Sequence, residues 1–257
     1  MKNGVDFKWF AIGKGELQAE IEQKIKEIRD ELEKRNVFVA DFTHEMKTPM
    51  TAIMGYAQML RSYDLDEKER DQAAEAIYNE AKRLEKLSLQ LLELYVYQNE
   101  TIDIERLDLH EIGEQLKTTL KFLSEKYEVQ YSIEFAEETV SANQVLLLSL
   151  LYNLADNAFK ASKPGTSIRI YNKVISDAVQ IYVEDEGRGI AKENIKLLTE
   201  PFWREDKSRS RKLGGAGLGL ALCKEIARIH GTELFFESEK NKGTRVSLTL
   251  LKGGAKE

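Results

Sequence analysis

A histidine beside a carboxylate is the first group along the chain with evident chemical use. His44 and Glu45 lie between Phe42 and Met46, which both fall on the apolar face of a predicted helix. His44 is two residues from each of them, about 200° around a helix that turns roughly 100° per residue, so its imidazole points to solvent. A neutral imidazole is a nucleophile near pH 7, and Glu45 can accept or orient the proton on its other nitrogen. Pro49 lacks the N–H that would bond the Glu45 carbonyl, so we expect the helix to bend there.

Zinc chemistry does not fit this segment. A zinc protease needs His-Glu-x-x-His, and Thr48 stands where the second histidine would be. His110 and His230 lie far away without metal-ligand spacing, and we interpret them as structural. The competing interpretation of His44 is a solvated surface histidine with a chance neighbour.

Two amides and an ammonium share one face of a later helical segment. Asn153, Asn157 and Lys160 follow one another at spacings of four and three residues. An amide oxygen is a hard ligand for Mg²⁺, and lysine offers a point charge to phosphate. The pattern therefore suits a phosphate chain with a divalent cation, or else a polar helix face exposed to water.

An acidic turn with two glycines follows a predicted strand. Asp185 precedes Gly187 and Gly189, and the glycines permit a tight turn and close approach of the backbone. A carboxylate at a strand end can accept a hydrogen bond from an exocyclic amine such as that of adenine. The alternative is an ordinary acidic turn.

A glycine-rich segment, residues 214–219, opens another predicted helix. Its backbone N–H groups lie at a helix N-terminus, which favours anions. It is neither a Walker loop, which needs Gly-Lys-Ser/Thr, nor a dinucleotide fingerprint, because the third glycine comes one residue early. The preceding segment, residues 204–212, has five basic and two acidic residues. It is either a lid that closes over phosphates or a solvated loop.

The elements that must position these groups change character near residue 100. Apolar residues recur in a heptad-like pattern from Ile21 onward, a polar break covers residues 61–70, and a second amphipathic helix runs from about 67 to 97. These features predict an antiparallel hairpin. Two helices alone bury too little apolar surface, so we expect two chains to pair into a four-helix bundle, with the segment before Asn36 as a parallel coiled coil.

The second part predicts an α+β sandwich, with helices on one face of a mixed sheet. We expect Ser176 and Asp177 to form a hairpin turn. The expected strands are 128–135, 167–175, 178–183, 233–237 and 244–251, and the expected helices are 109–127, 143–161 and 218–229.

Composition limits the possible partners. The 257 residues include 38 Lys and Arg against 44 Asp and Glu, a net charge of -6, so no global basic field exists to hold nucleic acid or an anionic bilayer. The single cysteine, Cys223, cannot form an internal disulfide, which fits a reducing compartment. The longest mainly apolar run, residues 145–152, is far below the roughly 18 residues that span a membrane.

Taken in order, the motifs resemble those of the sensor histidine kinases of two-component systems over roughly residues 30–251. The matching segments are a phosphoacceptor box (His44-Glu45-x-x-Thr48-Pro49), an N box (Asn153-x-x-x-Asn157-Ala158-x-Lys160), a first glycine box (Asp185-x-Gly187-x-Gly189), an F box (Pro201-Phe202-Trp203-Arg204), a second glycine box (Gly215-x-Gly217-x-Gly219-Leu220) and Gly243-Thr244. The sequence departs from the family where Ala161 replaces an aromatic residue and Asn143 an aspartate.

The resemblance implies three parts. They are an N-terminal linker and coiled-coil signalling helix (1–35), a dimerisation and phosphotransfer hairpin (36–100) and a catalytic ATP-binding domain (101–257). The last would be an α/β sandwich of the GHKL type, the fold shared with gyrase and the large heat-shock chaperone.

The resemblance also implies an activity. His44 would attack the γ-phosphate of ATP, and an aspartate of a response regulator receiver domain would then take the phosphoryl group. Glu45 would be the acid/base partner, and Thr48 would orient water when the regulator is dephosphorylated. Whether transfer runs within or between the protomers of the homodimer stays open, because spacing does not fix the hand of the bundle loop.

Nucleotide and metal residues follow from the same resemblance. Asn157 would hold Mg²⁺, Asp185 would read adenine, and Lys160 and Arg204 would meet the phosphates of ATP. The remaining nucleotide-binding residues implied are Asn153, Gly187, Gly189, Gly215, Gly217, Leu218, Gly219 and Thr244.

Two other functions compete with an autokinase. One is a catalytically quiet nucleotide-binding dimer that serves as a regulator-binding scaffold. The other is a general ATPase of the gyrase–chaperone superfamily, in which a glutamate activates water; here that place holds Asn153, whose amide cannot act as the base. Family members are usually membrane-anchored, but no apolar run in this sequence is long enough to span a membrane. We therefore expect either a soluble kinase or the cytoplasmic portion of an inner-membrane sensor, which would reach the membrane only through segments absent from this chain.

Overall fold

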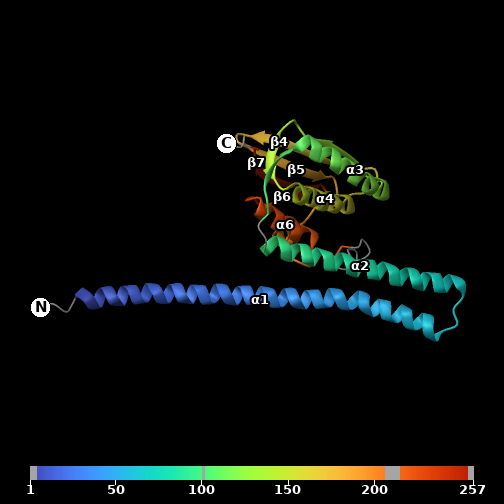
Figure 1. The fold of residues 1–257 in the computed structure, drawn as a ribbon, viewed down its shortest axis with the longest axis horizontal. Coiled ribbons are helices and arrows are strands. Elements are labelled where there is room, and N and C mark those ends of the chain that lie inside the picture. Colours follow the sequence, from blue (N-terminus) through green and yellow to red (C-terminus); the bar gives the residue numbers. More distant parts are fainter. Residues whose placement is uncertain (1–4, 100–101, 206–214, 254–257) are drawn as a thin grey trace.

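The computed structural model describes residues 5–99, 102–205 and 215–253, which form a long helical hairpin and a mixed sheet domain (Figure 1). Helix α1 (Val5–Ser62) and helix α2 (Glu67–Asn99) run antiparallel, which confirms the predicted hairpin. The connection is shorter than the predicted break because Asp66 already caps α2. Its carboxylate accepts the Glu69 N–H at 2.7 Å, and the Glu69 carboxylate accepts the Asp66 N–H at 3.1 Å.

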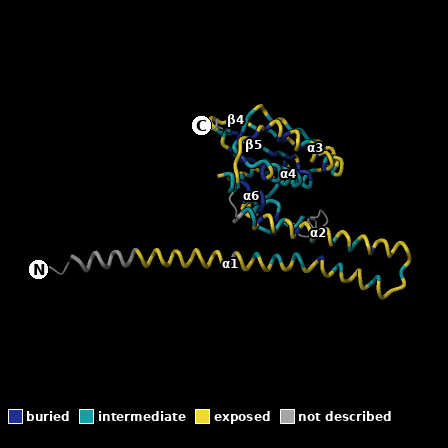
Figure 2. Tube along the Cα trace, viewed as in Figure 1, coloured by how far each residue is buried: buried dark blue, intermediate teal, exposed yellow. Residues whose placement is uncertain are grey.

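Helix α1 continues through Pro49, which is buried, so the proline does not end the helix. The first part of α1 extends away from the rest of the described chain (Figures 1 and 2). It carries apolar side chains at heptad spacing that are each 45–57% exposed: Leu17, Ile21, Ile25, Ile28 and Leu32. A single chain leaves this stripe in water.

The sheet domain contains all five strands predicted from the sequence. In spatial order they are β2 (Gln130–Glu134), β4 (Ser167–Ile175), β5 (Ala178–Asp185), β7 (Gly243–Leu251) and β6 (Phe235–Glu239). Strands β2 and β4 are parallel, and the other neighbours are antiparallel. The observed β6 begins two residues later than the predicted segment, and the turn at residues 176–177 is confirmed, with Ser176 at φ +50°.

Three helices of this domain also occupy their predicted places. They are α3 (Leu109–Tyr127), α4 (Gln144–Ala161) and α6 (Gly219–Ile229), and a 3₁₀ helix, η1 (Lys192–Leu197), follows the first glycine box. Helix α4 packs on the sheet between α3 and α6, and α6 in turn contacts α2 of the hairpin (Figure 1). The hairpin is therefore joined to the sheet domain by contact as well as by the chain.

Two short strands were missed by the sequence prediction. Strand β1 (Glu105–Asp108) pairs antiparallel with β3 (Thr139–Ala142). Each has four residues, too few for an alternating pattern to be recognised. Their pairing joins segments that are more than 30 residues apart in the chain, so only the folded arrangement defines them.

The end of α6 is tied to the start of α4 by His230. Its Nε2 accepts the Asn143 N–H at 2.9 Å, and its Nδ1 lies 2.7 Å from the Ile226 carbonyl oxygen. The Asn143 side chain in turn caps α4 by accepting the Leu146 N–H at 3.1 Å. Burial lowers the pKa of His230, which suits a neutral, structural histidine.

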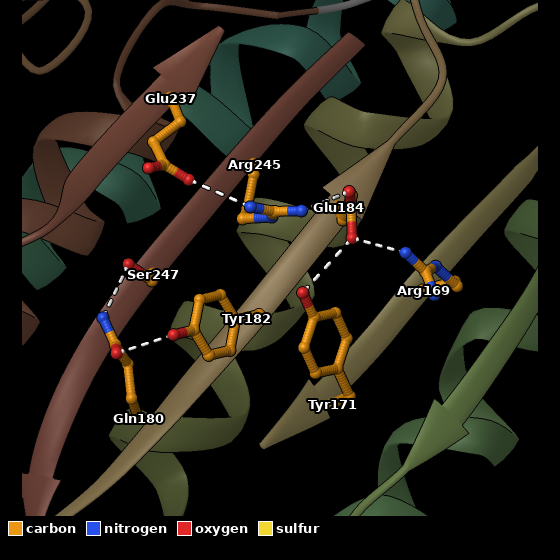
Figure 3. A network of polar contacts seen from close by, with 8 residues as sticks. All are labelled: Arg169, Tyr171, Gln180, Tyr182, Glu184, Glu237, Arg245 and Ser247. Carbon is orange, nitrogen blue, oxygen red and sulfur yellow. Dashed lines mark hydrogen bonds and ion pairs between the residues drawn. The ribbon is translucent and has the colours of Figure 1, made fainter. Parts of the chain in front are cut away.

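The two faces of the sheet differ in character. On the face away from the helices, Arg169, Glu184, Arg245 and Glu237 form a ladder of ion pairs across strands β4 to β6 (Figure 3). Beside this ladder, the rings of Tyr171 and Tyr182 stack with their centroids 4.9 Å apart. This polar face explains why polar and apolar residues alternate along these strands, since only the other face of the sheet contributes to the core.

Within the described residues, no helix combines the length and the apolar character needed to cross a membrane.

The core of the sheet domain should depend strongly on Phe159. This side chain is fully buried, with Tyr127 and Tyr131 rings 6.3 and 6.2 Å away. We expect Phe159→Ala to lower the free energy of unfolding by about 3–5 kcal/mol because it removes buried apolar surface and leaves a cavity. Denaturant unfolding followed by circular dichroism measures this. The matched control is Phe122→Ala, whose ring is 68% exposed and which should change stability by no more than about 0.5 kcal/mol; equal losses in the two variants would contradict the assignment of the core.

Candidate active site

His44 lies on the solvent side of α1, as predicted. Its side chain is exposed, whereas Met46 and Phe42 are partly buried against the sheet domain. One turn later, the Thr48 hydroxyl donates to the His44 carbonyl oxygen at 3.3 Å. The imidazole is therefore accessible to a reacting partner, with the Thr48 side chain on the adjacent turn.

Glu45 faces a different direction from His44. Its carboxylate pairs with Arg83 of α2 at 3.4 Å and with Arg204 of the F box. The Glu45 side chain is 15% exposed and that of Arg204 only 4%. In this arrangement, Glu45 connects the hairpin to the sheet domain instead of contacting a proton of the His44 ring.

The predicted N-box face lines a cavity of about 220 Å³. Asn153, Asn157 and Lys160 project from α4 into it, which confirms that the three share a face. The Asn153 amide donates to the Ser149 carbonyl at 2.9 Å, and the Lys160 ammonium lies 2.5 Å from the Asp156 carboxylate. The ammonium of Lys160 is thus already neutralised by a neighbour on its own helix.

Asp185, at the end of β5, lines the same cavity and is 8% exposed. Burial raises the pKa of its carboxyl from 3.8 to about 6, although backbone N–H groups of Gly187 and Thr244 donate to it and act in the opposite direction. A buried carboxylate without a cationic partner is a costly feature of a fold. Such groups are found mainly where a ligand needs an acceptor.

The first glycine box is shaped by close backbone packing. A Cβ on Gly187 would lie 2.7 Å from the Ala161 carbonyl oxygen, and Gly189, at φ +62°, would place one 2.0 Å from the Glu239 carbonyl oxygen. Ile190 donates to the Ser238 hydroxyl at 2.8 Å, which ties the loop to β6. Gly189 lines the cavity, whereas Gly187 supports Asp185 by its N–H.

The F box and the second glycine box are physically paired. Phe202, at φ +63°, donates its N–H to the Gly217 carbonyl at 2.9 Å. A Cβ on Gly217 would lie 2.8–3.1 Å from Phe202 backbone atoms. Gly215, Gly217 and Gly219 line the cavity, but the Leu218 side chain is fully buried beside Phe202 and does not. Leu218 can therefore reach a nucleotide only by its backbone.

Arg204 also lines the cavity and has unused hydrogen-bonding capacity. Its Nη2 donates to the Ala216 carbonyl at 3.2 Å and pairs with Glu45. Its Nε and Nη1 are buried and have no hydrogen-bond partner in the described structure. A buried guanidinium with free N–H groups is suited to an anion entering the cavity.

An apolar contact fixes the hairpin against this loop. Phe202, Leu218 and Leu87 form a buried cluster onto which Phe38, Phe42, Met46, Leu91 and Ala216 pack. The rings of Phe38 and Phe202 lie 5.3 Å apart. Phe202 thus packs against both α1 and α2, and two of its α1 neighbours, Phe42 and Met46, lie within one helical turn of Glu45.

The cavity can accept an adenine nucleotide by its chemistry. A buried carboxylate suits the exocyclic amine of the base, and amides with two basic groups suit phosphates and a cation. Thr244 lines the same cavity. The predicted lid falls mostly on residues 206–212, outside the described residues. His44 is not among the residues that line the cavity. Phosphoryl transfer would therefore require the cavity and His44 to come closer to each other.

Several residues at this site were not singled out by the sequence. Arg83 holds Glu45, Asp156 holds Lys160, Ser238 orders the first glycine box, and Lys86 and Gln90 of α2 line the cavity. Helical spacing could have indicated the α2 residues. Arg83, Lys86 and Gln90 share a face with the apolar residues of that helix.

Two family models match separate segments of the chain. Residues 34–98 match the His Kinase A (phospho-acceptor) domain, and residues 142–253 match the histidine kinase-, DNA gyrase B- and HSP90-like ATPase. The first segment contains the exposed His44, and the second contains the polar residues of α4 and Asp185.

Curated proteins with similar sequences are sensor histidine kinases. The chain is 34% identical over 225 residues to the sensor histidine kinase YkoH of Bacillus subtilis, covering 86% of this chain and 48% of that protein. It is 29% identical over 229 residues to the sensor histidine kinase WalK of the same organism, covering 85% and 37%. The chain spans about half the length of the curated relatives it matches.

Solved structures share the fold. The histidine kinase AdeS of Acinetobacter baumannii superposes with a TM-score of 0.66 at 21% identity, covering 82% of this chain and 98% of that one. The histidine kinase ThkA, crystallised in complex with the response regulator protein TrrA, gives a TM-score of 0.71 at 20% identity, covering 88% and 64%. The likeness extends over the hairpin and the sheet domain together.

The buried carboxylate of Asp185 should lower stability at neutral pH. Its folded-state pKa of about 6 exceeds its ordinary value of 3.8, so the folded state holds the proton more tightly and ionisation above about pH 6 is destabilising. We expect nucleotide-free Asp185→Asn to be more stable than the parent at pH 8, by on the order of 3 kcal/mol, with the difference vanishing as the pH falls toward 4.

Denaturant unfolding between pH 4 and pH 8 tests this expectation. The exposed Asp177 provides the control, since Asp177→Asn should follow the parent at each pH. A lower stability of Asp185→Asn at pH 8 would mean that the hydrogen bonds from Gly187 and Thr244 outweigh desolvation.

Proposed function

The chain belongs to the sensor histidine kinases of two-component systems, and from that premise we propose that it is an ATP-dependent protein-histidine autokinase. It phosphorylates itself on His44 and passes the phosphoryl group to an aspartate of a response regulator. The observation that carries the proposal is the exposed His44 beside Glu45, whose carboxylate is bound by Arg204 from the rim of a cavity with the N-box amides and Asp185.

In this proposal the nucleotide occupies that cavity. Asp185 accepts a hydrogen bond from the adenine amine, and Lys160, Arg204 and the backbone of the second glycine box contact the phosphates. The other residues proposed to contact or support the nucleotide are Asn153, Gly187, Gly189, Gly215, Gly217, Leu218, Gly219 and Thr244.

Magnesium is proposed to bind with the nucleotide. Mg²⁺ takes few protein ligands and keeps waters and phosphate oxygens. The described residues contain no cluster of three or more His, Cys, Asp or Glu side chains that could hold a metal, whereas the Asn157 amide lines the cavity. This donor set fits a cation held by Asn157 and mainly by phosphates, where it would offset their charge.

His44 and Glu45 have the remaining roles, in the transfer of the phosphoryl group. A nitrogen of the His44 imidazole forms a bond to the γ-phosphorus as the bond to the bridging oxygen of ADP breaks. Glu45 accepts or orients the proton on the other ring nitrogen. Because Glu45 is paired with Arg83 and Arg204 and His44 lies outside the cavity, we propose that the sheet domain moves relative to the hairpin before transfer.

We propose that the protein forms a homodimer and that it acts in the cytoplasm. The exposed heptad residues of α1 would be covered by a second chain, with residues 1–35 as a coiled coil, 36–100 as a four-helix bundle and 101–257 as the catalytic domain. The partner is a receiver domain, a proposal supported by the complex of the similar kinase ThkA with a response regulator.

A general ATPase is disfavoured by the N box. Asn153 lines the cavity where a glutamate would have to activate water, and its amide already donates to Ser149. An amide cannot take a proton from water, so direct hydrolysis should be slow.

Autophosphorylation on His44 is the first expected outcome. Incubation of the purified chain with γ-labelled ATP and Mg²⁺ should give label that is stable in alkali and lost in acid, and His44→Gln should give none. His110→Gln is the matched control and should be labelled like the parent. A parent that binds ATP yet acquires no label would instead favour the quiet nucleotide-binding scaffold.

Phosphatase activity should depend on Thr48. Its hydroxyl lies one turn after His44 on the exposed side of α1. With a phosphorylated receiver domain as substrate, we expect Thr48→Ala to slow dephosphorylation by about tenfold or more, because the attacking water loses its orienting group. Autophosphorylation should stay near the parent rate. Thr51→Ala, one turn further along the exposed side, serves as the control, and equal phosphatase rates for the parent and Thr48→Ala would refute the role.

A further inference from the structure

Helix α2 supplies two side chains to the wall of the nucleotide cavity. Lys86 and Gln90 line it together with the N-box residues and the second glycine box, although they come from the hairpin and not from the sheet domain. Neither belongs to any of the motifs recognised in the sequence.

Their position is set by the apolar contact between the two parts of the chain. Leu87 is 3% exposed and packs with Phe202 and Leu218. Lys86 is adjacent to Leu87 in the sequence, and Gln90 is three residues further on, so both flank this contact on one face of α2. The helix cannot rotate them away from the cavity without exposing Leu87.

Both side chains have capacity for a ligand. The Oε1 of Gln90 is buried and has no hydrogen-bond partner in the described structure. Lys86 forms no ion pair with any described residue. A buried amide oxygen without a partner is unfavourable, and an amide can also donate to a phosphate by its Nε2.

The other cations around the cavity are differently placed. Lys160 is paired with Asp156 at 2.5 Å, and Arg204 is paired with Glu45. Arg188 lines the cavity within the first glycine box, beside Asp185, at the end proposed for the base. Lys86 is therefore the cation near the second glycine box that has no carboxylate partner among the described residues.

We propose that Lys86 and Gln90 bind the polyphosphate of the nucleotide, so that the site is shared between the hairpin and the sheet domain. The inference rests on the proposed binding of ATP. Lys86 contributes its charge to the phosphates, the Gln90 Nε2 donates to a phosphate oxygen, and the Gln90 Oε1 accepts a hydrogen bond from a water bound to the phosphates. Bound nucleotide then contacts both parts of the chain and favours their docked arrangement, because a ligand stabilises the state it binds.

The test is the affinity of the full chain for ATP, ADP and adenosine in the presence of Mg²⁺, measured by calorimetry. We expect Lys86→Gln to weaken ATP binding by about three- to tenfold, ADP binding by less, and adenosine binding not at all. Gln90→Glu should weaken ATP binding by about tenfold because it places a negative charge against the phosphates.

The matched control is Lys82→Gln. Lys82 lies one turn earlier on α2, does not line the cavity, and has its ammonium 5.1 Å from the centre of the Tyr78 ring. It should bind all three compounds like the parent. Nucleotide-free melting temperatures of Lys86→Gln and Lys82→Gln should match that of the parent, since both side chains are exposed.

The contrary outcomes are distinct. If Lys86→Gln and Gln90→Glu bind ATP as the parent does, the hairpin takes no part in binding while the proposed function stands. If Lys86→Gln weakens adenosine as much as ATP, the residue acts through domain packing, and phosphate contact is excluded. If the parent itself binds no ATP, the proposed function fails, and this inference fails with it.

Discussion

The buried guanidinium of Arg204 connects the two parts of this molecule. It joins Glu45, next to the phosphoacceptor candidate, to the Ala216 carbonyl within the second glycine box, and it remains only 4% exposed. Removing a buried charge's partner leaves the other charge uncompensated, which is strongly unfavourable. The position of α1 against the sheet domain and the availability of Glu45 for proton transfer therefore depend on one another. Phosphate in the cavity would compete with Glu45 for this group.

The apolar packing around Phe202 makes that ion pair possible. The ring lies against Phe38 and in one cluster with Leu87 and Leu218, which excludes water from the Arg204 pair and strengthens its attraction. The loop can present Phe202 in this way only because Gly217 has no Cβ. The F box and the second glycine box, which look like separate motifs in the sequence, are one structural unit. The backbone of this unit is positioned by the close contact between Phe202 and Gly217.

The site also carries costs that the rest of the fold must offset. Among the described residues, the buried carboxyl of Asp185 has no cationic partner, and Arg204 and Gln90 each leave polar atoms without a hydrogen-bond partner. Features of this kind are destabilising unless a ligand completes them. The well-packed core of α4, with Phe159 fully buried, and the ion-pair ladder of Figure 3 on the opposite face of the sheet provide a rigid frame in which those groups persist. Asp185, Arg204 and Gln90 all line the same cavity.

The sequence by itself determined the hairpin, the five strands of the sheet, the exposure of His44 and the shared face of Asn153, Asn157 and Lys160. These follow from local periodicity, in which each residue's neighbours along the chain decide its environment. It did not determine the pairing of β1 with β3, the engagement of Glu45 by Arg204, or the approach of Lys86 and Gln90 to the cavity. Each joins segments that are distant in sequence, and no spacing rule records which distant residues meet. Tertiary structure decided them because they depend on how the hairpin docks, a consequence of burying Leu87 and Phe202 together.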